Sequence, residues 1–337
     1  MLGSAPGKTP GDKAMTATAM TAAGGPRTLT QAEVQRYFDD GFLIVENLFD
    51  PAELQPVMDE IAGIVDDLAR RLYAAGKVSS LHADKDFFHR LTALENEHNG
   101  TAVLVHINGW LGPHMARLWS DPRLLDIVQQ FIGPDIAGHP VWNIRSKTPD
   151  TRLMTVPWHQ DTAYLGEGAE TTLQPTAWIP FLDANAINGG LQVLRGGHKP
   201  GAVVRHRLEN TVGDRKSWYL YIDENDLPPG DIVTCEMKLG SVLFLNQLVP
   251  HRSLENRSDK VRWSVDLRWQ DPALPNGDQG GSGTIVMRKQ SDPAFTVDWD
   301  AWAAKQRDAY KEQRGLSGDA FDTTVEGKWM DRWRAAA

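Results

Sequence analysis

Cysteine is almost absent from this chain of 337 residues, because Cys235 is its one thiol. A single cysteine forms neither an intramolecular disulfide nor a cysteine zinc cluster, which excludes a disulfide-stapled secreted domain and predicts a reducing, cytoplasmic setting. Long apolar runs are lacking too, since stretches such as Gly240–Leu245 end well short of the ~20 residues that a membrane span needs. We therefore expect no transmembrane segment.

Positive charge is scarce relative to negative charge: 35 Lys and Arg residues against 44 Asp and Glu residues give a formal net charge of −9. The resulting field repels phosphate backbones and anionic lipid surfaces, so we expect neither nucleic acid nor membrane as a partner. With 41% hydrophobic and 23% charged residues, the chain has the composition of a globular protein with its own core.

The beginning of the chain differs in composition from the rest. Residues 1–29 are rich in Gly, Ala, Thr and Pro and lack the apolar centre of a secretory signal, so we expect a flexible tail, with a transit peptide as the alternative. Residues 30–337 are predicted to form a single domain, in which 30–137 is mainly helical support, 138–270 is a β-rich core and 271–337 is a C-terminal extension.

Helix signals are clear in the first part of this domain. Thr30–Glu33 is a capping box that predicts a helix start, with Tyr37 and Phe38 facing the core. A β-branched and apolar run at Phe42–Val45 predicts a strand. Apolar residues at three- and four-residue intervals then predict an amphipathic helix from Asp50 to Leu72.

From about Gly138 the chain breaks into short apolar runs that end at Pro, Gly, Asn or Asp, which is typical of β-sandwiches and barrels. We expect a mainly β jelly roll, the cupin-like double-stranded β-helix, with flanking helices. The connection 199–230 is too long for a structureless loop, so it is expected to carry small elements and to lie over the mouth of a site. The seven candidate strands are Val141–Ser146, Leu153–Trp158, Thr176–Leu182, Leu191–Leu194, Ile232–Met237, Ser241–Leu245 and Val261–Trp269.

The segment Val156–Asp161 ends in His-x-Asp, and residues two apart on a strand point the same way. His159 and Asp161 are therefore able to converge on one cation. A second histidine, His251, follows 92 residues later after another apolar strand. Two imidazoles and one carboxylate form the facial triad typical of non-haem iron(II), whereas a closed zinc site needs a fourth protein ligand.

Arg262 stands 11 residues after His251, inside an apolar strand. A guanidinium that points into an apolar barrel is costly unless an anion meets it there, and its planar fork fits a carboxylate. That anion is expected to be the distal carboxylate of 2-oxoglutarate. A pair with an internal acid, or a surface position, is the alternative interpretation.

In order and spacing, a set of motifs resembles the phytanoyl-CoA dioxygenase family of iron(II)/2-oxoglutarate oxygenases, from Thr30 to about Trp269. The resemblance implies a double-stranded β-helix with flanking helices. It implies that His159, Asp161 and His251 bind iron and that Arg262 anchors 2-oxoglutarate. The motifs are Leu29–Thr30 through Gly41–Phe42, Lys147–Asp150, Trp158–Asp161, Asn188–Leu191, Gly196–Lys199, and His251 followed by Arg262.

Family logic also marks further candidates for holding the cosubstrate. They are Asn143, Arg145 and Lys147 on the strand before the triad, together with Trp178 and Ser264. Ser264 lies two positions beyond Arg262 and so shares its strand face. For Trp178, core packing is the alternative.

The resemblance implies that iron(II), 2-oxoglutarate and dioxygen act together, with succinate and carbon dioxide released and a C–H bond of a small molecule hydroxylated. Related halogenases carry a small residue in place of Asp161, so halogenation is disfavoured. Desaturation, epimerisation or ring formation would use the same site. A non-redox zinc or nickel protein and a ligand-binding jelly roll without turnover are the rival classes, and we expect a monomer or homodimer.

The substrate is the least determined feature. An acyl-CoA would require cations near the mouth, and the segment 195–216 is basic, although a solvated basic face is the alternative. Ectoine is disfavoured because ectoine hydroxylases carry a longer acidic and aromatic signature after the His-x-Asp. Glu167 and Glu170 are weak indications of a cationic substrate. A metabolite or natural-product intermediate is the expected substrate.

Overall fold

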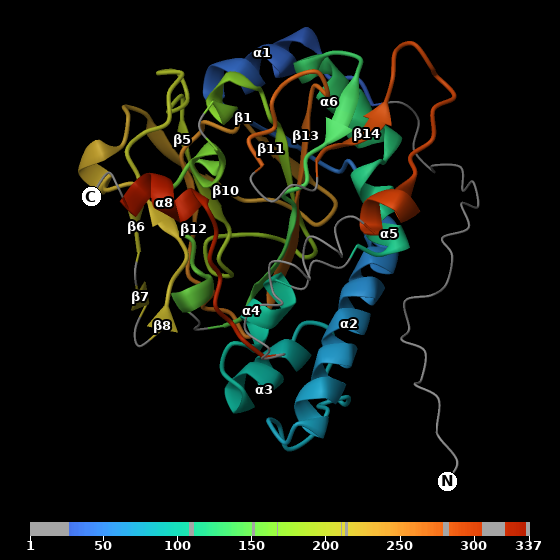
Figure 1. Ribbon diagram of the computed structural model, residues 1–337, viewed down its shortest axis with the longest axis vertical. Helices are drawn as coiled ribbons and strands as arrows, with labels where there is room; N and C mark the ends of the chain where they lie inside the picture. The colour runs from blue at the N-terminus through green and yellow to red at the C-terminus, as the bar shows by residue number, and fades with distance from the viewer. Residues whose placement is uncertain are drawn as a thin grey trace.

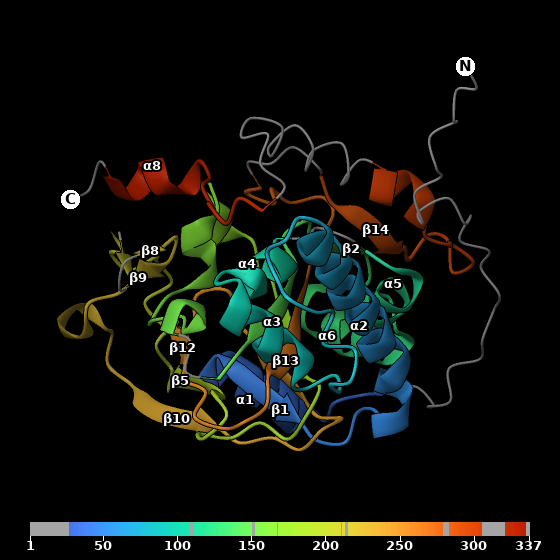
Figure 2. The same cartoon turned by 90° about the horizontal axis from the view of Figure 1, so that it is seen from below.

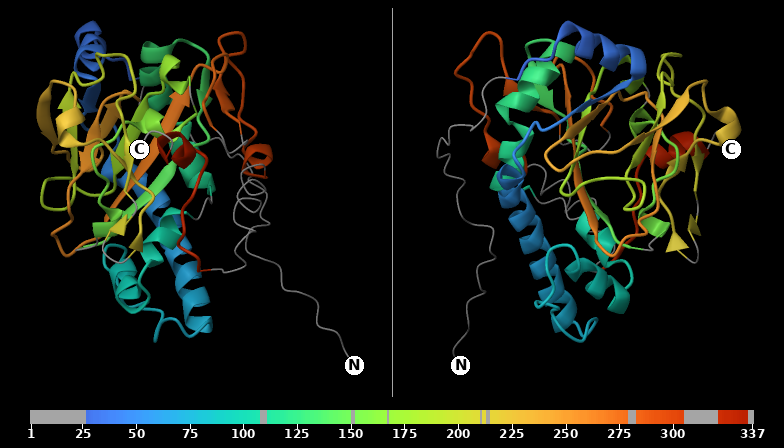
Figure 3. Two further views of the ribbon diagram at one scale, coloured as in Figure 1. Left: turned by 60° about the vertical axis from the view of Figure 1, so that its left-hand side comes forward. Right: turned by 180° about the vertical axis from the view of Figure 1, so that it is seen from behind.

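The fold was analysed in a computed structural model, which describes residues 27–107, 111–149, 152–166, 168–209, 211–212, 215–278, 283–304 and 321–334. Two sheets face each other, and helices cover the outer side of the larger one (Figure 1). The long helix α2 (Pro51–Ala74) stays on the side away from the smaller sheet in the further views (Figure 3).

Both predicted helix starts are confirmed. The first helix, α1 (Gln31–Asp40), has Thr30 as its N-cap in a reciprocal capping box with Glu33. Asp50 and Glu53 form the same arrangement at the start of α2, and the predicted apolar stripe of α2 is buried. These caps satisfy backbone N–H groups that a helix start leaves without an intrahelical acceptor.

Two details at the N-terminal end differ from expectation. Leu29, placed in the tail by composition, is buried in the core, and its backbone N–H donates to Gln130 Oε1 at 2.7 Å. Phe38 is 40% exposed and does not face the core, whereas Tyr37 is fully buried and stacks on Phe131. The packed part of the chain therefore begins before Thr30. Most of the predicted tail, residues 1–26, lies outside the described residues.

Four further helices complete the helical layer on the outer face of the larger sheet (Figure 2). Their apolar residues belong to the same buried cluster as the outer face of the sheet. These helices are α3 (Arg90–Glu97), α4 (Thr101–His106), α5 (Pro113–Trp119) and α6 (Pro122–Ile132). Helices thus make up most of the described chain before residue 136.

The larger sheet has the strand order β1-β11-β4-β13-β2-β14, with β3 also paired to β13. All of its pairings are antiparallel. The sheet therefore brings together segments from both ends of the chain. Its strands are β1 (Phe42–Val45), β2 (Ile136–Gly138), β3 (Asn143–Lys147), β4 (Thr176–Pro180), β11 (Val242–Leu245), β13 (Arg262–Gln270) and β14 (Ile285–Arg288).

The smaller sheet has the order β10-β5-β12, built from β10 (Asp231–Cys235), β5 (Leu191–Arg195) and β12 (His251–Ser253). An isolated antiparallel bridge between His159 and His251 extends it by one position. Facing sheets of this kind, flanked by helices, agree with the jelly-roll prediction.

Six of the seven predicted strands are confirmed. The exception is Leu153–Trp158, which is wrong: the chain forms a short 3₁₀ helix, η1 (Arg152–Met154), and then runs without strand pairing to His159. Pro157 has no backbone N–H to give to a strand ladder. His251 was expected at the end of the apolar strand Ser241–Asn246; that strand, β11, ends at Leu245, and His251 begins the separate strand β12.

The connection 199–230 carries small elements, as predicted. They are β6 (Arg207–Leu208), β7 (Thr211–Val212), β8 (Arg215–Lys216), β9 (Leu220–Tyr221) and the 3₁₀ helix η4 (Glu224–Asp226). Within the C-terminal extension, β14 joins the larger sheet and the short helix α8 (Trp329–Arg334) packs against β6. Residues 299–304 are helical, and residues 305–320 lie outside the described part.

None of the helices described here is long and apolar enough to cross a membrane.

Candidate active site

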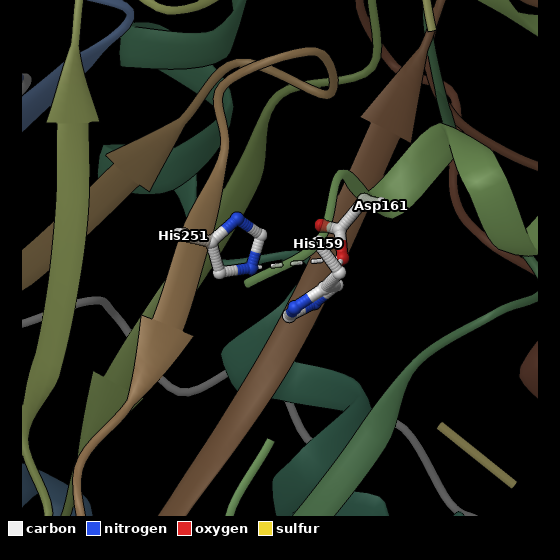
Figure 4. A group of neighbouring side chains, drawn as sticks. All are labelled: His159, Asp161 and His251. Carbon is white, nitrogen blue, oxygen red and sulfur yellow. Dashed lines mark ion pairs between the residues drawn. The ribbon is translucent and has the colours of Figure 1, made fainter. Parts of the chain in front are cut away.

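Three side chains converge between the two sheets: His159, Asp161 and His251 (Figure 4). One potential ligand atom from each lies within 4.8 Å of the others. Asp161 Oδ1 is 3.7 Å from Nε2 of His159 and 3.8 Å from Nε2 of His251. All three side chains are buried. The prediction that these residues meet is confirmed.

Backbone pairing places the two imidazoles side by side. The His159 N–H donates to the His251 carbonyl at 3.0 Å, and the His251 N–H donates back at 2.9 Å. Residues that exchange both bonds in an antiparallel pair project to the same face, and the ring centroids lie 4.2 Å apart. Asp161 begins the 3₁₀ helix η2 (Asp161–Tyr164), so a turn, not a continuing strand, aims its carboxylate.

Both imidazoles present Nε2 to the centre of the group. His159 Nδ1 lies 2.8 Å from the Pro157 carbonyl oxygen, and His251 Nδ1 lies 3.1 Å from that of Val249. A carbonyl oxygen only accepts, so each Nδ1 donates and each Nε2 keeps its lone pair for a metal. Burial, together with the neighbouring His159, lowers the pKa of His251 to about 4, which keeps this ring neutral near pH 7.

Asp161 is held through one of its two oxygens. Oδ2 accepts from Arg268 Nη2 at 2.9 Å, from Arg268 Nε at 3.3 Å and from Thr176 Oγ1 at 3.1 Å. Oδ1 is thereby left toward the histidines. Burial by itself raises the pKa of Asp161, but the charge of Arg268 and the nearby imidazoles outweigh it and hold that pKa well below its usual value.

The strand β13 separates an apolar face from a polar one. Its sequence RWSVDLRWQ alternates, and all nine residues are buried. The apolar half packs into the core cluster with the helices. On the polar half, Arg262, Asp266 and Arg268 line a cavity that also contains the triad, whereas Ser264 and Gln270 are not among its lining residues.

Arg262 lies in this cavity without an anionic partner. It is 3% exposed, its Nη1 donates to Ser264 Oγ at 2.6 Å, and its guanidinium lies 5.3 Å from the centre of the Trp178 ring. Its Nε has no hydrogen-bond partner, and within the described residues it forms no ion pair. Burial, with a contribution from Arg145, lowers its pKa to about 10. Arg262 is therefore a buried cation prepared for an anion.

Lys147 lies opposite Arg262 in the pairing of β3 with β13. It is 2% exposed, and its Nζ donates to Ser253 Oγ at 2.6 Å and to the Leu254 carbonyl. Burial and the charge of Arg262 hold its pKa well below the usual value. A second basic group thus borders the space in front of Arg262.

The other predicted cosubstrate residues have different positions. Arg145 lines the cavity and forms an ion pair with Asp266, Nε to Oδ2 at 2.6 Å. Trp178 lines it beneath Arg262. Asn143 is on β3 opposite Asp266, but it is not among the residues that line the cavity.

Among the cavity residues that sequence reasoning missed are Ser253, Asp266, Arg268, Thr176 and Tyr219. The alternation along β13 carried a signal for two of them, since Asp266 and Arg268 follow Arg262 at even spacing. Ser253 similarly follows His251 by two positions, and Thr176 precedes Trp178 by two. For Tyr219 the sequence held no such signal.

The donor set fits the cofactors that the resemblance implies. Two imidazole nitrogens and one carboxylate oxygen supply a facial triad, and no fourth His, Cys, Asp or Glu joins the group among the described residues. The unpartnered Arg262 Nε, with the Ser264 hydroxyl beside it, fits the distal carboxylate of a dicarboxylate such as 2-oxoglutarate.

Comparison with known proteins identifies the class. Residues 37–264 match the model of the family "Phytanoyl-CoA dioxygenase (PhyH)", so the chain belongs to that family. The protein is an iron(II)- and 2-oxoglutarate-dependent dioxygenase, with dioxygen as the other co-substrate. Membership of this family decides against the zinc or nickel protein and the non-catalytic jelly roll.

Several relatives and solved structures are similar to the chain. An ectoine dioxygenase of Bordetella parapertussis is 27% identical over 250 residues, covering 70% of this chain and 74% of its own. The peroxisomal phytanoyl-CoA dioxygenase of Bos taurus is 24% identical, in a match that covers 75% of this chain and 72% of the relative. A 1-deoxypentalenic acid 11-beta-hydroxylase of Streptomyces arenae is 28% identical, in a match that covers 48% of this chain and 58% of the relative.

Among solved structures, the non-haem monooxygenase ThoJ in its apo form superimposes with a TM-score of 0.54 at 19% identity, covering 90% of this chain and 99% of its own. This likeness confirms the predicted fold. The relatives are named for different compounds, so their names do not give the substrate of this protein.

Proposed function

We propose that the protein hydroxylates a C–H bond of a small-molecule metabolite or natural-product intermediate. The balanced reaction takes substrate, 2-oxoglutarate and dioxygen to the alcohol, succinate and carbon dioxide. The observation that carries the proposal is the presence, in one cavity, of an open three-residue metal site and a buried cation without an anionic partner.

Each residue has a role that its surroundings support. His159, His251 and Asp161 Oδ1 would hold iron(II), which when bound supplies the redox chemistry with dioxygen. Arg262 would hold the distal carboxylate of 2-oxoglutarate, with Ser264 and Lys147 beside it and Trp178 under the guanidinium. The paired sheets bury these groups, which strengthens their electrostatic interactions and keeps bulk water from the reaction.

Hydroxylation is supported over halogenation by Asp161. Related halogenases have a small residue at this position, whereas here a carboxylate is present and is fixed by Arg268 and Thr176. If iron(II) is bound here, the Asp161 carboxylate would be one of its ligands, in the place that halogenases leave open for a halide.

The surface around the connection 199–230 gives little support for an acyl-CoA. Arg195 lies 3.8 Å from Asp40, and Arg207 forms ion pairs with Asp223 and Asp226 at 3.3 and 2.9 Å. These cations already have acidic partners. Glu170 accepts from the Gly168 N–H, and Glu167 lies outside the described residues. A substrate selected mainly by a surface charge is therefore not favoured.

The test is succinate formation by protein reconstituted anaerobically with iron(II) and then given 2-oxoglutarate and air. Wild type is compared with His251→Ala, Arg262→Ala and the control His89→Ala, which changes a histidine outside the cavity. We expect succinate from wild type and the control, none from His251→Ala and much less from Arg262→Ala.

Tight coupling to substrate would suppress this uncoupled turnover, so binding is measured as well. 2-Oxoglutarate is titrated into the nickel(II)-loaded protein by calorimetry. If wild type neither forms succinate nor binds 2-oxoglutarate, the proposed function is wrong.

A further inference from the structure

Two buried side-chain donors that line the active-site cavity lack a hydrogen-bond partner. They are Arg262 Nε on β13 and the Tyr219 hydroxyl in the connection 199–230. Tyr219 is 2% exposed. A buried donor without an acceptor is costly, so a native structure that keeps one in a ligand cavity indicates that the ligand supplies the acceptor.

The two donors face the same cavity. Its lining includes Arg262, Tyr219 and the ion pair of Arg145 with Asp266. Burial raises the pKa of the Tyr219 phenol, so it stays protonated and able to donate. Of these cavity groups, Arg145 and Asp266 already satisfy each other, whereas Arg262 Nε and the Tyr219 hydroxyl are left for a ligand.

Tyr219 is held in place on both sides. Its neighbour Trp218 stacks on His106 of α4, with centroids 5.9 Å apart and ring planes at 17°. The Leu220 N–H donates to the Tyr164 hydroxyl at 2.9 Å, and the Ile222 N–H donates to the Trp158 carbonyl at 2.7 Å. The hydroxyl is thus fixed at the cavity wall, and rotation to solvent would require moving packed neighbours.

We propose that Tyr219 is a cosubstrate-binding residue, whose hydroxyl donates to the distal carboxylate of 2-oxoglutarate alongside Arg262. This inference rests on the proposed function. In this arrangement Arg262 Nε and the Tyr219 hydroxyl, which lack partners in the protein, each donate to one oxygen of the same carboxylate. It also means that 2-oxoglutarate joins β13 to the connection 199–230, and so fastens that connection over the cavity.

A contact with the organic substrate is the competing role for Tyr219. The cosubstrate is favoured because both unpartnered donors line one cavity and a carboxylate offers two acceptor oxygens, whereas a neutral substrate would leave Arg262 without an anion. The two roles differ in which ligand loses affinity when the hydroxyl is removed.

The experiment measures 2-oxoglutarate binding to nickel(II)-loaded protein by calorimetry, for wild type, Tyr219→Phe and the control Tyr221→Phe. Tyr221 is two residues away and does not line the cavity. We expect Tyr219→Phe to weaken binding about 10- to 100-fold, the usual effect of losing a hydrogen bond to a charged group. Tyr221→Phe is expected to bind as wild type, and nickel affinity is expected to be equal in all three.

A second ligand makes the assignment specific. 2-Oxopentanoate keeps the chelating carboxylate and keto group but has a methyl group in place of the distal carboxylate. Tyr219→Phe should bind it as well as wild type does. Equal weakening of both ligands would indicate a general disturbance of the cavity and would overturn the assignment.

Hydrogen exchange gives an independent readout. In wild type, 2-oxoglutarate should slow exchange of the Leu220 and Ile222 amides, and this protection should be lost in Tyr219→Phe. If wild type fails to bind 2-oxoglutarate, the proposed function fails. If wild type binds it and Tyr219→Phe binds it equally well, only the role of Tyr219 is wrong, and a raised substrate KM in that variant would assign the hydroxyl to the substrate.

Discussion

Replacing Arg268 by methionine is expected to destabilise the metal-free protein strongly. Arg268 is 5% exposed and is the main cationic partner of Asp161, through Nη2 at 2.9 Å and Nε at 3.3 Å. Methionine fills a similar volume but leaves the Asp161 carboxylate buried beside the two histidines without its cation. Family matching ends at residue 264, so this prediction depends on the structure alone.

The magnitude follows from the burial of both partners. Removing one member of a buried ion pair typically costs about 3–5 kcal/mol, because the other charge stays desolvated. Thr176→Val, which removes one hydrogen bond to the same oxygen, should cost about 1.5–3 kcal/mol. The surface pair of Arg257 with Glu255 provides the control, since exposed pairs contribute about 0–1 kcal/mol and Arg257→Met should change little.

The assay is urea unfolding of EDTA-treated protein, followed by tryptophan fluorescence. The pH dependence gives a second check. In wild type the depressed pKa of Asp161 stabilises the fold above the unfolded pKa of about 3.9, and that contribution is lost as the pH falls through the folded value. In Arg268→Met, burial without the cation should raise the pKa of Asp161. The difference in unfolding free energy between wild type and variant should therefore be largest near pH 7 and become smaller toward pH 4. A variant within about 1 kcal/mol of wild type at pH 7 would refute the reasoning.

Three further predictions follow from the same contacts. Burial lowers the pKa of His106, His139 and His251 to about 4 and that of His206 to about 3. Between pH 6.5 and 4 these four histidines are therefore protonated in the unfolded chain but neutral in the folded chain. The unfolding free energy of metal-free protein should therefore fall over this range in urea titrations, and a flat profile would contradict the burial of these rings. Arg262→Met should raise the stability of ligand-free protein by about 1–3 kcal/mol, because it removes a buried cation without an anionic partner, while calorimetry shows the loss of 2-oxoglutarate binding. Trp333→Phe removes the N–H that donates to the Ala163 carbonyl at 2.9 Å, two residues from Asp161. It should weaken metal binding roughly 10-fold, as the loss of hydrogen bonds that support metal ligands usually does. If the metal affinity of Trp333→Phe equals that of the control Arg334→Ala, α8 does not support the metal site.

The triad and its anchor were predictable because short-range patterns carry them. His159 and Asp161 are two residues apart, and His251 and Arg262 follow in strands with strong apolar character. The same patterns gave seven strands, β1 among them, and two helix starts. In each case neighbouring residues in the sequence determine the local conformation, and burial then selects one face.

What the sequence could not provide was set by contacts between distant segments. Leu153–Trp158 is apolar enough for a strand, yet Pro157 and the turn at Asp161 leave one bridge position, His159. Tyr219 lies in a connection without a regular pattern, and its place in the cavity depends on Trp218 stacking on a helix more than 100 residues earlier. No periodicity in the sequence encodes that contact.

The polar face of β13 explains how stability and binding are balanced in this fold. Its apolar half, Trp263 to Trp269 at alternate positions, packs with the helices and supplies the driving force for burying the whole strand. Its polar half is buried with it, and two of the three charged side chains there, Asp266 and Arg268, form ion pairs with Arg145 and Asp161. Arg262 is left without an anion. Because the apolar face compensates for that cost, the fold can retain a buried cation without an anionic partner. Under the proposed function, 2-oxoglutarate would supply the missing anion, and its binding would then stabilise the fold. The packing on the opposite side of β13 would in that case make a cosubstrate site at Arg262 energetically possible.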